Sequence, residues 1–293
     1  MIKALLICVA IVLGTVVPQL VRAVPALPYV IGLLLLVSFC ALPLGGSRPT
    51  RRHWWLILAS WVIGGTACAV LWPVDRALAL GALLSGAAPT ATAAPVVVAA
   101  LGGDAAFAAV AVLGSNLIAC LAFPALLAVL QGADAPGSPW QLLLRVAPVV
   151  FTPWLLSRAL LRLRPSWAAG IAAQMDRSFL LWLCGLAVIS ASAADHLRHA
   201  GLHALLPHAL TAVVLCVTSF VTGRLLGGAK ALESGQSLGQ KNTALATWTA
   251  LACAGPPAAL VPVSYILAHN VWNAVQLARR PRRSGTGAHA SPP

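Results

Sequence analysis

The sequence predicts an all-α membrane protein with many transmembrane helices. Of its 293 residues, 60% are hydrophobic and only 9% are charged, whereas a soluble globular protein carries about 25% charged residues. The mean hydropathy is +0.89. Soluble enzymes, nucleic-acid-binding modules and disordered regulators are therefore poor candidates. The hydrophobic residues also fall into runs of about 20, the length of a transmembrane helix.

Ten such runs follow one another, separated by charged residues, proline or glycine. We expect spans at 3–20, 27–46, 53–73, 77–101, 105–130, 139–160, 178–194, 204–226, 237–253 and 257–278. The first run has the composition of a signal peptide. However, no clear cleavage site follows it closely and the next span begins at once, so we expect a retained helix.

Lysine and arginine are distributed unevenly over the two sides of these spans. With the N-terminus in the cytoplasm, 14 of the 19 basic residues lie inside and 3 outside, while Arg145 and Lys241 lie within spans. The inside residues are Lys3, Arg48, Arg51, Arg52, Arg158, Arg162, Arg164, Arg177, Arg224, Lys230, Arg279, Arg280, Arg282 and Arg283; the outside residues are Arg22, Arg76 and Arg198. Basic residues gather in cytoplasmic loops, so the net charge of +13 indicates membrane topology with both termini cytoplasmic. The excess of arginine over lysine and the abundant alanine are typical of a GC-rich bacterial genome, so we expect the membrane to be a bacterial inner membrane.

Ten spans divide into two sets of five, at 1–131 and 132–278, and a basic tail at 279–293 that we expect to be cytoplasmic and disordered. An odd number of spans per half makes the second half enter the membrane in the opposite direction, as in inverted-repeat transporters. The fourth span of each half is interrupted, at 88–95 and at 237–243. A broken helix frees backbone groups that lipid cannot satisfy, so the two breaks predict a transporter's binding site. Two kinks in ordinary packing helices are the alternative.

Both breaks carry motifs that resemble those of the bile acid:sodium symporter family. PTATAAPVVVAALGGDAAF, which begins at Pro89, resembles the family's P-G-G-T-A-S-N-V…G-N/D segment, and SLGQKNTALA, which begins at Ser237, resembles its E-x-G-M-Q-N-S-G-L segment. LAHNVWNAV in the last span is similar to the family's W-H-N-x-S-G-S. The resemblance implies a panel domain of helices 1, 2, 6 and 7 and a core domain of helices 3–5 and 8–10, in which the two broken helices cross. It also implies alternating-access transport of an organic anion, such as a bile acid or a small carboxylate, that binds between the two domains and is driven by sodium.

The sequence departs from the family pattern where sodium would bind. The family's Ser-Asn pair falls on Ala94 and Pro95, and its hydroxyl ligands in helix 5 fall on Ala108 and Val112. Its acidic ligand in the second break falls on Ser237. Alanine, valine and proline side chains offer no oxygen. We therefore expect one sodium site to be absent and the other to lack its carboxylate, and we expect no cofactor.

Lys241 stands where the family has glutamine in the second break. A lysine at the centre of a transmembrane helix costs about 2.5–3.5 kcal/mol on insertion scales, so it is a candidate functional residue. Together with Ser237 it forms our cation-site equivalent, in which the ammonium substitutes for sodium. The ammonium either keeps its charge throughout or loses and regains a proton in each cycle. A structural lysine that reaches the interface or binds carbonyls is the alternative.

Other polar residues are candidates for contact with the substrate, together with helix N-terminal N–H groups, which favour a carboxylate. These residues are Thr90, Thr92, Gln240, Asn242, Thr243, His269 and Asn270. By resemblance Thr92 and Asn242 are the strongest, and a packing role is the alternative for His269. We expect Asp104 to cap the helix that follows it, with gating as a second possibility.

Catalytic and metal-binding motifs are weak. His196, His199, His203 and His208 lack the spacing of a zinc site, and the seven cysteines form no C-x-x-C. No G-x-S-x-G is present and no two acidic residues are close in sequence, so we expect neither an enzyme nor a metal site.

The sequence thus predicts a sodium-independent carrier, active or facilitative, for a small organic anion. A sodium- or proton-coupled symporter and a non-transporting membrane sensor are the alternatives.

Overall fold

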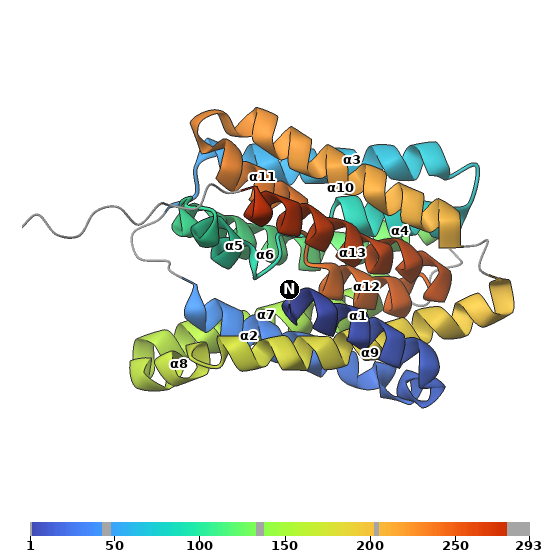
Figure 1. Ribbon diagram of the computed structural model, residues 1–293, viewed down its shortest axis with the longest axis horizontal. Coiled ribbons are helices and arrows are strands. Elements are labelled where there is room, and N and C mark those ends of the chain that lie inside the picture. Colours follow the sequence, from blue (N-terminus) through green and yellow to red (C-terminus); the bar gives the residue numbers. More distant parts are fainter. Residues whose placement is uncertain (1, 43–47, 133–137, 202–204, 280–293) are drawn as a thin grey trace, which may run out of the picture.

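The computed structural model describes residues 2–42, 48–132, 138–201 and 205–279, and every regular element in these ranges is a helix (Figure 1). The tail from residue 280, with its three arginines, lies outside the described residues. In chain order the elements are α1 (Ile2–Val16), the 3-10 helix η1 (Pro18–Ala26), α2 (Leu27–Ala41), α3 (Arg51–Leu71), α4 (Arg76–Gly86), α5 (Ala94–Ala100), α6 (Ala105–Gln131), α7 (Pro139–Leu163), α8 (Pro165–Ala172), α9 (Met175–Ala200), α10 (Leu205–Gly227), the 3-10 turn η4 (Gly228–Lys230), α11 (Ala231–Gly239), α12 (Thr243–Cys253) and α13 (Pro256–Ala278).

Six helical stretches among these residues are long and apolar enough to cross a membrane, which makes the chain a multi-pass membrane protein. They are Pro18–Ala41, Arg51–Leu71, Ala105–Gln131, Trp140–Leu163, Arg177–Asp195 and Leu205–Gly239. The N-terminal helix, α4 and α12 are apolar but shorter. Length and composition therefore support six spans, and the ten-span arrangement stays a prediction.

Three boundaries differ from those that the sequence predicts. The first helix ends at Val16 and is followed by the 3-10 helix η1, which begins at Pro18 and contains a second proline. The short helix α8 begins at Pro165, which has no N–H for the preceding helix and fits a helix start instead. Residues 231–236, which lie between two predicted spans, form the first turns of α11, so the second break covers only 240–242.

Side-chain caps fix the starts of several helices. Asp75 accepts a hydrogen bond from the Leu78 N–H at the start of α4, and Asp104 accepts from the N–H groups of Ala106 and Phe107 at the start of α6. Each cap satisfies N–H groups that the first turn of a helix leaves free. The expected cap at Asp104 is confirmed.

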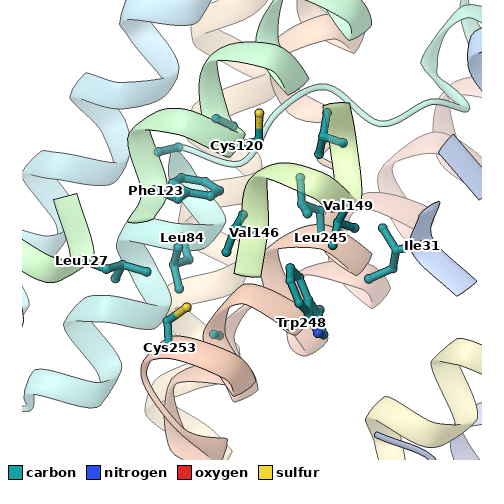
Figure 2. Close-up of a cluster of buried hydrophobic side chains, with 14 of the residues drawn as sticks. Ile31, Leu84, Cys120, Phe123, Leu127, Val146, Val149, Leu245, Trp248 and Cys253 are labelled. Atoms are coloured by element: carbon teal, nitrogen blue, oxygen red, sulfur yellow. The ribbon is translucent and has the colours of Figure 1, made fainter. Parts of the chain in front are cut away.

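The helices form two layers (Figure 1). We call α1, η1, α2, α7, α8 and α9 the lower layer and the remaining helices the upper layer. A large apolar cluster joins the two layers, with side chains from α2, α4, α6, α7 and α12 (Figure 2). Phe123 of α6 and Leu245 of α12 are fully buried in it beside Val146 of α7.

The two breaks lie against each other within the upper layer. Residues 87–93 separate α4 from α5, residues 240–242 separate α11 from α12, and Thr90 forms an antiparallel bridge with Lys241. Glycines allow the first half of each broken helix to pack closely on its neighbour. A Cβ on Gly64 of α3 would lie 2.6 Å from the Ala87 backbone nitrogen. A Cβ on Gly223 of α10 would lie 2.5 Å from the Ser234 carbonyl oxygen.

Candidate functional site

The backbones of the two breaks satisfy each other. The Ala91 N–H donates to the Gln240 carbonyl oxygen at 2.7 Å, and the Asn242 N–H donates to the Pro89 carbonyl oxygen, also at 2.7 Å. These groups lack helical partners and would be costly in hydrocarbon. The crossing therefore explains how two interrupted helices are stable within the membrane.

Side chains of α6 bind the backbone of Thr90 in the first break. The Thr90 N–H donates to Ser115 Oγ at 2.9 Å, and Asn116 Nδ2 donates to the Thr90 carbonyl oxygen at 3.0 Å. Asn116 Oδ1 in turn accepts from Asn242 Nδ2 at 3.0 Å, which ties α6 to both breaks. Asn116 is fully buried. The sequence analysis missed Ser115 and Asn116, although an asparagine inside an apolar span is a signal of function or packing.

Lys241 lies at the centre of this crossing. Its side chain is 1% exposed, and Nζ donates a hydrogen bond to Ser60 Oγ of α3 at 2.7 Å. Ser60 Oγ itself donates to the Gly86 carbonyl oxygen, at the C-terminal end of α4, at 3.0 Å. Among the described residues, no acidic side chain forms an ion pair with Lys241. The ammonium is thus held near the negative end of a helix dipole and has no carboxylate partner.

A cavity of about 250 Å³ lies between the crossing and helices α1, α2 and α9. One side of it is polar and is lined by Thr92, Gln240, Lys241, Asn242, Thr243, His269 and Asn270. The opposite side is mostly apolar and is lined by Ile7, Ile31, Leu34, Leu35, Phe179 and Trp182. The cavity therefore suits a small molecule with a polar head and an apolar body.

Seven of the nine site residues that the sequence proposed line this cavity, and two do not. Thr90 is buried in the crossing, where its Oγ1 donates to the Ser237 carbonyl oxygen at 2.6 Å. Ser237 is also buried, at 3% exposure, within α11. Both residues hold the two breaks together instead of facing the cavity.

Several buried polar atoms at the site have no hydrogen-bond partner. Gln240 Oε1 and His269 Nδ1 belong to cavity-lining residues, and Ser237 Oγ lies behind them. An unpaired buried polar atom costs about 1–3 kcal/mol, so such atoms need an explanation. Gln240 Oε1 and His269 Nδ1 are enclosed, so they pair with a molecule in the cavity only if their side chains turn toward it.

Four of the positions where the resemblance implies sodium ligands are apolar and enclosed. Ala94, Ala108 and Val112 are fully buried, and Pro95 is buried beside Ala94 in the first turn of α5. Within the described part of the chain, no three His, Cys, Asp or Glu side chains gather as a metal site would require. His203 and the side chains of His196 and His199 lie outside that part.

An ion cluster at the start of α6 lies apart from the cavity. Lys230 Nζ lies 3.0 Å from Asp104 Oδ2 and 3.6 Å from Glu233 Oε1, while Glu233 Oε1 accepts from the Asp104 N–H at 2.9 Å. The hydrogen bond from Lys230 holds the pKa of Asp104 below its ordinary value, with the N–H of Phe107 contributing further. This cluster joins the α5–α6 turn to α11.

The arrangement as a whole places the buried Lys241 ammonium, which has no carboxylate partner among the described residues, beside a cavity with one polar and one apolar side. Such a cation favours an anion in the cavity, because charges interact strongly where water is scarce. None of the described groups around the cavity forms a nucleophile–base pair of the kind that covalent catalysis requires.

Residues 50–255 match the model of the SBF-like CPA transporter family. The matched segment contains both breaks, Ser60 and Asn116. No curated protein matches the chain.

Proposed function

The chain belongs to the SBF-like CPA transporter family, a family similar to the bile acid:sodium symporters, and from that premise we propose that it carries a small organic anion across a membrane by alternating access. Membership confirms the resemblance to the bile acid:sodium symporter family that the motifs of the two breaks indicated, and it indicates a membrane transporter. The substrate, the coupling and the topology below are our proposal.

The proposed topology has ten spans in two inverted repeats of five, with both termini cytoplasmic. The packing of the helices supports it, because pairs recur in the two halves: α3 packs on α4 as α10 packs on α11, and α5 packs on α6 as α12 packs on α13. When the two halves are matched, α1 corresponds to α7 and α2 corresponds to α9. The packing of α1 on α9 then corresponds to the packing of α7 on α2. The lower-layer helices then form the panel, and the upper-layer helices form the core. The excess of basic residues on one side of the ten spans supports the cytoplasmic termini.

The single observation that carries the proposed mechanism is Lys241. Its ammonium lies at the crossing, bonded to Ser60, with no carboxylate partner among the described residues. We infer that it takes the place of a bound sodium ion and attracts the anionic end of the substrate to Thr92, Asn242 and Thr243 on the polar side of the cavity. Transport is then independent of sodium.

The cavity size favours a small carboxylate over a steroid-sized substrate. Its volume is about 250 Å³, whereas pockets for drug-sized ligands measure about 300–1,000 Å³. The apolar wall formed by α1, α2 and α9 would hold a short aliphatic or aromatic body.

Uptake into proteoliposomes tests this proposal. The purified protein would be supplied with labelled small carboxylates, with sodium or choline outside and with or without a pH gradient. We expect equal uptake in sodium and choline, and a loss of more than tenfold in Lys241→Gln, because removing one partner of a buried charge pair typically costs about 2–5 kcal/mol. Lys230→Gln is the matched control, since it removes the same charge far from the cavity, and its uptake should stay within about twofold of wild type.

Each alternative function has its own outcome in this assay. Uptake that requires sodium would refute the built-in cation, and uptake that follows only a pH gradient would indicate proton coupling. Stabilisation of the protein by the carboxylate without any flux would indicate a membrane sensor.

A further inference from the structure

A second and larger cavity lies on the other side of α13 from the crossing. It is a groove of about 1020 Å³ between α10 and α13 on one side and α1 and α9 on the other. Its lining residues run from Leu205 to Arg224 on α10 and from Leu260 to Arg279 on α13. At 1.5 Å per residue, each stretch is about 28 Å long, close to the thickness of the hydrocarbon core of a bilayer.

The wall of this groove is apolar over most of its length. Val213 and Val217 of α10 and Leu267 and Val271 of α13 line it, and all four are exposed. Small residues such as Ala268 leave room between them. A groove of this kind, exposed on a membrane protein, suits an acyl chain.

One end of the groove is basic. Arg224 and Arg279, from the last turns of α10 and α13, both line it and are exposed. When the Gln276 amide oxygen faces Trp272 and Arg224, it accepts hydrogen bonds from Trp272 Nε1 at 3.0 Å and from Arg224 Nη2 at 3.2 Å. The second bond orients the Arg224 guanidinium at the groove. No acidic residue is among the described residues that line the groove.

We propose that this groove binds one anionic phospholipid, with its phosphate on Arg224 and Arg279 and an acyl chain along the apolar wall. Basic pockets between transmembrane helices are known to hold anionic lipid headgroups. Guanidinium groups bind phosphate strongly through paired N–H donors. In the proposed topology the basic end faces the cytoplasmic leaflet, and the lipid lies between the panel and the core. The lipid site is separate from the cavity at Lys241 and does not depend on the transported substrate.

Native mass spectrometry of the purified full-length chain tests the proposal. The protein would be released from mixed micelles that contain equal amounts of phosphatidylglycerol and phosphatidylcholine. We expect the wild type to retain phosphatidylglycerol preferentially, and the double variant Arg224→Gln/Arg279→Gln to lose about tenfold or more of that preference. The control Arg162→Gln/Arg164→Gln removes two exposed arginines from the end of α7 and should keep it.

Two further measurements test whether both the acyl chain and the headgroup of the lipid contribute to binding. Ala268→Phe fills the groove and should lower retention of phosphatidylglycerol while the protein stays folded, as judged by its melting temperature. Glycerol phosphate, which has the headgroup charge but no acyl chain, should not compete. Equal retention of the two lipids by the wild type, an unchanged preference in the Arg224/Arg279 variant, or full competition by glycerol phosphate would overturn the proposal.

Discussion

Replacing Asn116 with alanine should lower the stability of the crossing measurably. The Asn116 side chain is fully buried and makes two bonds between elements, one to the Thr90 carbonyl oxygen and one from Asn242 Nδ2. Its third bond, to Val112, lies within α6. The alanine variant leaves the Thr90 carbonyl and the Asn242 amide without these partners.

The expected size follows from the two interhelical bonds. Such bonds in membrane proteins contribute about 0.6 kcal/mol on average and about 1.7 kcal/mol at most. Losing two of them should therefore cost about 1–3 kcal/mol, which corresponds to a fall in melting temperature of about 2–5 °C.

Thermal unfolding of the detergent-solubilised protein with a thiol-reactive dye would measure this fall. Cys120 and Cys253 are fully buried and become reactive only on unfolding. Asn270→Ala is the matched control, because the Asn270 amide bonds only to the Ile266 carbonyl of its own helix and lies partly exposed at the cavity. A loss of stability in Asn116→Ala no larger than in Asn270→Ala would refute the view that α6 side chains hold the breaks together.

Two more substitutions test the packing and the ion cluster. Gly239→Ala should destabilise the protein by about 1–3 kcal/mol, because its Cβ would lie 2.3–2.5 Å from Phe220 ring carbons. The control Gly65→Ala, whose Cβ meets nothing within 4 Å, should leave the melting temperature unchanged or raise it. Equal losses of stability in the two variants would contradict this expectation. Asp104→Asn keeps the helix cap but loses the ion pair with Lys230, which is worth at most about 1 kcal/mol because both side chains are partly exposed. Since the pKa of Asp104 is lowered in the fold, this contribution should be complete above its ordinary value of 3.8 and vanish as the pH falls through the lowered value. A difference in melting temperature between wild type and variant that grows as the pH falls would contradict the assignment.

The positions of the two breaks could be predicted from the sequence, whereas the contacts between them could not. The two breaks, the position of Lys241 between them and the cap at Asp104 follow from local pattern, because proline, glycine and polar residues interrupt an apolar run visibly. Sequence alone could not pair Lys241 with Ser60 or Asn116 with Thr90, since these contacts join segments that are far apart in the chain. The first turns of α11 were wrongly placed outside the predicted spans. They are helical, since a helix that is buried in protein can carry Ser234 and Gln236 without contact with lipid.

The bonded crossing also has a consequence for how the protein is made. Thr90 and Ser237 are 147 residues apart, so the first break enters the bilayer long before its partner has been synthesised. Until α11 and α12 follow, its free backbone groups must be satisfied by α6, by water or by the insertion machinery. The hydrogen bonding of the first break is thus incomplete until α11 and α12 supply the carbonyl oxygens of Ser237 and Gln240 and the N–H of Asn242.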